Sequence, residues 1–163
     1  MKTPEMLILC GLPASGKNTW LRDNQKKLKN YIVVELDWIR KELFGHQFYR
    51  DAEPFILAMA KGTAKMLLCQ GKNIIINSTG VTIGIRNEWA NMAKKYGYRT
   101  KVVFFDVDVA TCHKRNRKRK ENRVPDEVIV RMAGLLHVPV RGPFDGPTFY
   151  GPDIADKIVV VRS

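Results

Sequence analysis

A phosphate-binding loop is predicted at residues 11–19. Gly11 and Gly16 bracket four residues ahead of Lys17, so consecutive backbone N–H groups can curl around the phosphates of a nucleotide. Lys17 would reach the β- and γ-phosphates as a point charge. The sequence therefore predicts a nucleotide site whose residues are Gly11, Leu12, Pro13, Ala14, Ser15, Gly16, Lys17, Asn18 and Thr19.

Two asparagines occupy positions that usually bind or orient Mg²⁺ in this kind of site. The residue after the loop lysine is normally Ser or Thr, whose hydroxyl ligates the metal, and in this chain it is Asn18, followed by Thr19. An amide oxygen is a bulkier ligand for the tight octahedral geometry of Mg²⁺. Asn77 ends an apolar run at a place that usually carries an acid. We expect both residues on the metal side, with nucleotide binding retained and metal-assisted turnover weakened.

Asp37 and Arg40 are candidates for the chemistry beside the nucleotide. The hydrophobic period changes from strand-like to helical after Glu35, so Asp37 is expected at a helix N-terminus with Arg40 one turn later on the same face. A helix cap with a nearby ion pair accounts for the two residues as well as a functional role does.

A strongly basic segment, residues 113–120, lies within a predicted helix over Ala110–Lys120. Four residues separate Arg115 from Arg119, so the two side chains should share a helix face. Such a run is typical of a solvated face or of a patch that contacts nucleic acid. In a phosphate-loop kinase it is also where an arginine-bearing lid is expected.

Strands and helices alternate along the rest of the chain. Strands are expected at residues 6–10, 31–35, 73–77, 98–106 and 158–161, and helices at 18–28, from Asp37 onward, and at 54–70, 86–95, 110–120 and 124–136. In the helix over 54–70, we expect Met59, Met66, Leu67 and Leu68 to fill the core, and we expect Pro139–Asp153 to be a surface loop.

This alternation predicts an α/β fold of the P-loop NTPase type, a three-layer α/β/α arrangement with a mostly parallel sheet. A helical lid is expected at about residues 110–136. The 163 residues are expected to form a single domain, residues 1–163, ending soon after the last strand.

Composition limits the partners and the compartment. The net charge of +12 and the isoelectric point near 9.8 favour a polyanionic partner, nucleic acid above all, although a generally basic surface is the alternative. Three widely spaced cysteines, Cys10, Cys69 and Cys112, indicate neither a disulfide framework nor a zinc site and fit a reducing cytoplasm. No run approaches the ~20 apolar residues of a membrane span, so no membrane partner is expected.

Taken together, these motifs resemble the kinase domain of the bacteriophage polynucleotide 5′-kinase family. The resemblance extends over most of the chain and is specific as a combination. It rests on the Gly-x-Pro-x-Ser-Gly-Lys loop followed by Thr19-Trp20, the Asp-x-x-Arg motif at Asp37–Arg40, the strand end Phe105-Asp106-Val107, the lid residues Lys114-Arg115-Asn116 with Arg119, and Val124-Pro125. The phosphatase domain that some relatives carry is not expected.

The resemblance implies an ATP- and Mg²⁺-dependent enzyme of nucleic acid repair that transfers the γ-phosphate of ATP to the 5′-hydroxyl end of DNA or RNA. By position, Asp37 would be the general base and Arg40 would contact the phosphate of the acceptor. Lys17, Arg115 and Arg119 would clamp ATP. Val124 and Val128 would pack on the nucleobase of the acceptor.

Two other functions remain open at this point. A kinase of small metabolites or nucleosides would share the loop, the fold and the lid, but a neutral acceptor gives no reason for so basic a chain. A catalytically weak, nucleotide-gated nucleic-acid-binding protein would account for Asn18 and Asn77. The sequence leaves the oligomeric state and the choice between DNA and RNA undecided.

Overall fold

Five strands and six α-helices alternate along the chain in the computed structural model, which describes residues 3–45, 50–140 and 152–162. In chain order the elements are β1 (Glu5–Cys10), α1 (Lys17–Asp23), β2 (Tyr31–Glu35), α2 (Leu36–Phe44), the 3-10 helix η1 (Arg50–Ala52), α3 (Glu53–Cys69), β3 (Asn73–Asn77), α4 (Ile83–Lys95), β4 (Arg99–Asp106), α5 (Val109–Arg117), α6 (Asp126–Gly134) and β5 (Lys157–Arg162). The predicted α/β class is confirmed.

The strands form one parallel sheet in the order β2-β3-β1-β4-β5. Ile8 of β1 and Ile74–Ile76 of β3 are fully buried, as expected for central parallel strands that are covered on both faces. In a parallel sheet, the carboxyl ends of all strands meet at one edge. The phosphate loop leaves β1 at this edge, which is therefore where a ligand is expected.

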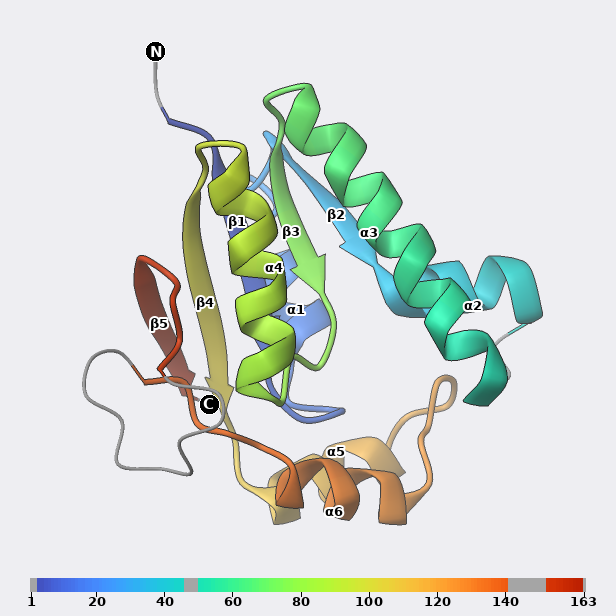
Figure 1. Ribbon diagram of the computed structural model, residues 1–163. Helices are drawn as coiled ribbons and strands as arrows, with labels where there is room; N and C mark the ends of the chain where they lie inside the picture. The colour runs from blue at the N-terminus through green and yellow to red at the C-terminus, as the bar shows by residue number, and fades with distance from the viewer. Residues whose placement is uncertain (1–2, 46–49, 141–151, 163) are drawn as a thin grey trace.

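Helices cover both faces of the sheet, so the fold has three layers. Figure 1 shows α3 and α4 on one face and α1 on the other. On the α3–α4 side, Ile8 and Ile76 pack in one core cluster with Trp89 of α4. On the other side, Trp20 of α1 packs against a second cluster that includes Phe105. The Trp20 ring meets the Phe105 ring edge to face, with centroids 5.9 Å apart, and this contact holds α1 against β4.

The segment predicted as a lid consists of α5 and α6, which lie beyond the carboxyl ends of the strands in Figure 1. A small third core joins these helices to the loops at the sheet edge. Leu12 of the phosphate loop and Val81 pack there with Cys112 of α5 and Ile129 of α6. Since Leu12 lies within the phosphate loop, the two helices are fixed directly against the candidate nucleotide site.

Several predicted helix boundaries are wrong. The helix predicted to reach Leu28 ends at Asp23, where the Asn24 side-chain amide donates a hydrogen bond of 2.9 Å to the carbonyl oxygen of Trp20. The helix predicted to reach Lys120 ends at Arg117. Arg119 therefore lies in the turn that follows α5, and the shared helix face expected for Arg115 and Arg119 does not exist. Pro125 is the N-cap of α6 and lies just outside its first turn.

The predicted core face of α3 is wrong at its two methionines. Met59 and Met66 are 43% and 54% exposed, whereas Leu67 and Leu68 are buried as expected. The buried stripe of α3 follows Ile56, Ala60, Ala64 and Leu67, which are spaced three or four residues apart, and both methionines fall outside it.

A fully buried ion pair braces the loop that follows β3. Arg86 Nε lies 2.6 Å from Asp153 Oδ1, and Arg86 Nη2 lies 2.9 Å from Oδ2, with both side chains completely inaccessible. Arg86 Nη1 also donates to the carbonyl oxygen of Gly80 at 2.8 Å. The neighbouring Thr79 carbonyl accepts from the Gly11 N–H at 2.8 Å, so this brace extends to the phosphate loop.

Asp153 was expected in a surface loop, yet its side chain is buried; residues 141–151 of that predicted loop lie outside the described residues. Among the helices that the structure describes, none combines the length and apolar character needed to span a bilayer.

Candidate active site

The phosphate loop has a backbone shape that depends on small residues. A Cβ at Gly11 would lie 2.7 Å from Ser15 Oγ and 2.9 Å from Phe105 Cβ, closer than real Cβ contacts. Gly16, the N-cap of α1, has a φ of +102°, which glycine adopts without a steric penalty. Ala14 also has a positive φ, +64°. Strained backbone of this kind is concentrated at ligand sites.

Lys17 is folded back over this loop. Its Nζ donates hydrogen bonds to the carbonyl oxygens of Gly11, at 2.8 Å, and Leu12, at 2.9 Å. Burial lowers the pKa of Lys17 from 10.5 to about 8; the negative charge of Asp37 opposes this shift and the positive charge of Arg119 adds to it. Asp37 and Arg119 are thus close enough to Lys17 to act on it electrostatically.

The two lid arginines approach the loop in different ways. Arg115 extends from α5, and its Nη1 lies 3.5 Å from the carbonyl oxygen of Ser15. Arg119 lies beyond the helix, and its Nη1 donates to the carbonyl oxygen of Asn122 at 3.3 Å. Together with Lys17, the two arginines place three cations around the loop. They do so without sharing a helix face, because α5 ends at Arg117.

Asp37 and Arg40 are in contact on α2. Arg40 Nη1 donates to Asp37 Oδ1, and the Asp37 side chain remains 85% exposed. The other nitrogens of Arg40 are held by Glu53 at the start of α3, with Nε at 2.6 Å from Oε1 and Nη2 at 2.7 Å from Oε2. This paired geometry fixes the plane of the guanidinium. Glu53 is not among the residues predicted from the sequence, because its partner lies 13 positions earlier.

The two asparagines predicted on the metal side are in contact. Asn77 Nδ2 donates to Asn18 Oδ1 at 3.0 Å. The β2–β3 register pairs Glu35 with Asn77. Burial, then the charge of Asp37, raise the pKa of Glu35, and a hydrogen bond with the Asn18 side chain partly offsets them. Glu35 is not among the predicted residues; its place at the carboxyl end of a strand near the phosphate loop is the signal that could have identified it.

The oxygen atoms at this position suit Mg²⁺. Glu35 offers a carboxylate, and Asn18 and Asn77 offer amide oxygens. Mg²⁺ prefers oxygen ligands and is usually held by one or two carboxylates together with substrate phosphates. Among the described residues no group of three or more His, Cys, Asp or Glu side chains could hold a metal without such help. The residues present therefore fit a Mg²⁺ ion that arrives with a nucleotide.

Val124 and Val128 lie on the lid. Asn116 holds the backbone of Val124 at both ends, donating to its carbonyl oxygen at 2.7 Å and accepting from its N–H at 3.2 Å. The Val124 side chain is half-buried against the small core that contains Leu12 and Ile129. Val128 is half-buried on α6.

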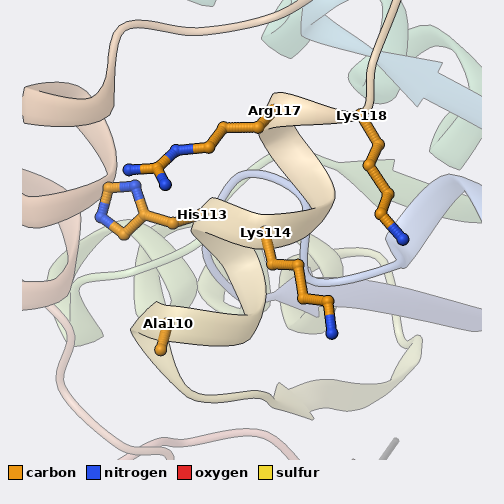
Figure 2. A pocket seen from close by; sticks show the side chains of 5 residues that line it. All are labelled: Ala110, His113, Lys114, Arg117 and Lys118. Carbon is orange, nitrogen blue, oxygen red and sulfur yellow. The ribbon is translucent and has the colours of Figure 1, made fainter.

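A basic hollow of about 550 Å³ lies along α5. Figure 2 shows His113 and Arg117 leaving the helix on one side, and Lys114 and Lys118 on the other. His113 Nδ1 and Arg117 Nη2 each lie 3.3 Å from a carboxylate oxygen of Asp126 on α6. The described lining residues, Ala110, His113, Lys114, Arg117 and Lys118, all belong to α5 and its C-cap, so the lid carries positive charge outside the phosphate loop as well.

Comparison with known proteins identifies the family to which the chain is similar. A family model described as an AAA domain matches residues 6–139. The chain is 27% identical over 144 residues to the L-seryl-tRNA(Sec) kinase of Methanococcus maripaludis, covering 82% of this chain and 53% of that protein. It is 25% identical over 144 residues to the toxin zeta of Streptococcus pyogenes, covering 82% and 50%.

Among solved structures, a chain of the Pnkp1/Rnl/Hen1 RNA repair complex superposes with a TM-score of 0.74 at 27% identity, over 83% of this chain and 45% of that one. The resemblance to polynucleotide kinases and the P-loop NTPase fold are confirmed. The chain spans about half the length of the curated relatives it matches.

Proposed function

The chain belongs to the AAA domain family, and from that premise we propose that it is a polynucleotide 5′-hydroxyl kinase that uses ATP as phosphate donor. The observation that carries the proposal is the position of Asp37. This carboxylate contacts Arg40 and lies close enough to Lys17 to counter the fall in the pKa of the lysine. An exposed carboxylate within electrostatic reach of a phosphate-binding lysine could accept the proton of an attacking hydroxyl group.

In the proposed reaction, the 5′-hydroxyl oxygen attacks the γ-phosphorus of ATP. The new O–P bond forms as the bond from the γ-phosphorus to the β–γ bridging oxygen breaks, the hydroxyl proton passes to Asp37, and ADP leaves. Lys17, Arg115 and Arg119 offset the negative charge around the loop. When bound, Mg²⁺ would neutralise charge on the β- and γ-phosphates, and Asn18 and Asn77 are the residues that would hold it.

Arg40 is proposed to contact a phosphate of the acceptor. Its guanidinium is already held by Glu53 and Asp37, so an incoming phosphate would meet a cation in a fixed orientation. The exposed edge of Asp37 would then face the terminal hydroxyl. Val124 and Val128 on the lid are proposed to pack on the nucleobase of the acceptor.

A polynucleotide is favoured over a small neutral acceptor by charge. The chain carries a net charge of +12, and the α5 hollow adds lysines and an arginine beyond those around the loop. Such charge steers a polyanion and binds it in a salt-dependent manner. The similarity to a chain of an RNA repair complex supports the same substrate class.

The test is transfer of labelled phosphate from ATP to 5′-hydroxyl DNA and RNA oligonucleotides, over a series of Mg²⁺ and Mn²⁺ concentrations. We expect product with at least one oligonucleotide and a KM for it that rises steeply with salt. A salt-independent KM, or transfer only to a free nucleoside or sugar, would point to a metabolite kinase. The Asn18–Asn77 contact favours one further candidate, a nucleotide-gated nucleic-acid-binding protein, which would bind both ligands and give no product with any metal.

A further inference from the structure

The acid that usually accompanies a phosphate-loop metal is absent from the end of β3 in this chain. Asn77 stands there, and its amide is hydrogen-bonded to Asn18, the residue that replaces the metal-ligating hydroxyl. One strand away, Glu35 ends β2 and is paired in register with Asn77. A carboxylate is thus still present at the same edge of the sheet, displaced by one strand.

The chemistry of the three side chains is complementary. A Ser or Thr hydroxyl ligates a metal through its oxygen and donates its proton to an acid. Asn18 can do the same with two atoms: Oδ1, which accepts from Asn77 in this structure, and Nδ2, which is a donor. The hydrogen bond between the Asn18 side chain and Glu35 provides the acidic partner.

The neighbouring acid is less suited to this role. Asp37 contacts Arg40, so its charge is offset by a guanidinium. Glu35 is half-buried, and in the part of the chain that the structure describes it forms no ion pair, so its charge is available to a cation.

We propose that Glu35 is the acidic residue of the metal side: its carboxylate orients Asn18 and supplies the negative charge that Asn77 lacks. This role rests on the proposed function only in requiring a nucleotide with its metal in the phosphate loop. It is independent of the acceptor. Glu35 thereby positions the ligand residue Asn18, and its loss should weaken the metal more than the nucleotide.

The experiment measures metal affinity without catalysis. Mn²⁺ is titrated into the purified protein saturated with a non-hydrolysable ATP analogue, and free Mn²⁺ is followed by electron paramagnetic resonance. Glu35→Gln should weaken Mn²⁺ binding by about tenfold or more, as loss of an outer-shell acid does, while metal-free nucleotide affinity changes less than about threefold. Glu42→Gln, at an exposed glutamate of α2, should leave Mn²⁺ binding unchanged.

A double variant that moves the carboxylate from β2 to β3 gives the decisive test of the proposal. In Glu35→Gln/Asn77→Asp the acid returns to β3, and Mn²⁺ affinity should recover to within about threefold of the original chain. A Glu35→Gln protein that is folded, by its melting temperature, and binds Mn²⁺ normally overturns the proposal, as does a double variant no better than the single one. If Glu35→Gln does not fold, Asn77→Asp alone decides: Mn²⁺ affinity should rise, and an unchanged value overturns the proposal.

The outcome separates this inference from the proposed function. Glu35-dependent Mn²⁺ binding without phosphorylation of any oligonucleotide supports the metal role and overturns the kinase proposal. Phosphorylation of an oligonucleotide, together with Mn²⁺ binding that does not change in Glu35→Gln, supports the kinase proposal and overturns the metal role of Glu35. A chain that binds no nucleotide at all overturns both.

Discussion

Asn77 donates a hydrogen bond from Nδ2 to Oδ1 of Asn18, 3.0 Å away. The two positions at which the chain departs from the usual phosphate-loop pattern therefore form one unit, even though 59 residues separate them. In the usual phosphate-loop pattern a hydroxyl and a carboxylate meet at these two positions. In this chain the side-chain amides of Asn18 and Asn77 meet there instead. A substitution at either position should therefore alter the orientation of the other side chain and the affinity for the metal.

Asn18→Thr should lower the Mg²⁺ concentration needed for half-maximal phosphate transfer by about three- to tenfold. A hydroxyl is a more compact ligand for the octahedral geometry of Mg²⁺ than an amide is. The measurement is the initial rate of transfer against Mg²⁺ concentration at saturating ATP. An unchanged or higher requirement would show that the residue at position 18 does not face the metal.

Asp37→Asn should reduce kcat by about 10²–10⁴-fold, the usual contribution of a general base, with little change in the Kd for ATP. Asp37 is exposed and contacts Arg40, so the variant should fold normally. Glu42→Gln, on the same helix, is the matched control. Kinase activity close to the original in Asp37→Asn would remove the assignment of the base.

Arg115→Ala and Arg119→Ala should each slow transfer sharply, by about 10³-fold or more for an arginine that stabilises the charge of the transferring phosphoryl group. Arg115 lies beside the Ser15 carbonyl, and Arg119 acts on Lys17 through its charge. Single-turnover rates separate this effect from weaker ATP binding. Arg123→Ala, at an exposed arginine in the segment before α6, should behave like the original chain. Equal losses in all three variants would argue against a specific role for Arg115 and Arg119.

ATP binding should take up a proton above pH 8. The pKa of Lys17 is about 8 in the free protein, and phosphates favour its charged form, so the pKa in the complex must be higher. Below pH 8 the lysine is already charged and contributes no uptake. Above pH 8 affinity should fall with rising pH, by up to about tenfold per unit.

Isothermal titration calorimetry of ATP binding at pH 7 and pH 9, in buffers of different ionisation enthalpy, measures this proton uptake. It should be near zero at pH 7 and approach roughly one proton at pH 9. The same small value at both pH values would contradict a lowered pKa for Lys17. Lys17→Arg, whose guanidinium remains charged in this range, should lose the pH dependence.

Asp153→Ala should lower the free energy of unfolding by about 3–5 kcal/mol, because it leaves the guanidinium of Arg86 buried without its partner. Both side chains of this pair are fully inaccessible. Asp106→Ala, which breaks the exposed pair with Arg162, should change stability by less than about 1 kcal/mol. Urea unfolding compares the two, and similar values for both variants would contradict the role of the buried pair.

The sequence alone determined the strand order along the chain, the phosphate loop and the type of residue at the ends of β2 and β3. Strands such as Tyr31–Glu35 and Asn73–Asn77 were predicted to the residue, because short aliphatic runs bounded by polar residues are a local signal. The position of Asp37 in the first turn of α2 follows from the same kind of signal. The glycines of the phosphate loop were identified for a local reason too, since the close contact at Gly11 and the positive φ at Gly16 belong to one short segment.

Only the tertiary structure decided which distant residues meet. Glu53 holds Arg40 across the α2–α3 junction, Asp153 reaches Arg86 from 67 positions away, and Glu35 lies beside Asn77 because of strand register. None of these contacts has a periodicity or a motif, since each depends on how the layers pack. For the same reason Met59 and Met66 were wrongly placed in the core: helical spacing gives the width of a buried stripe, but the neighbouring strands fix its direction.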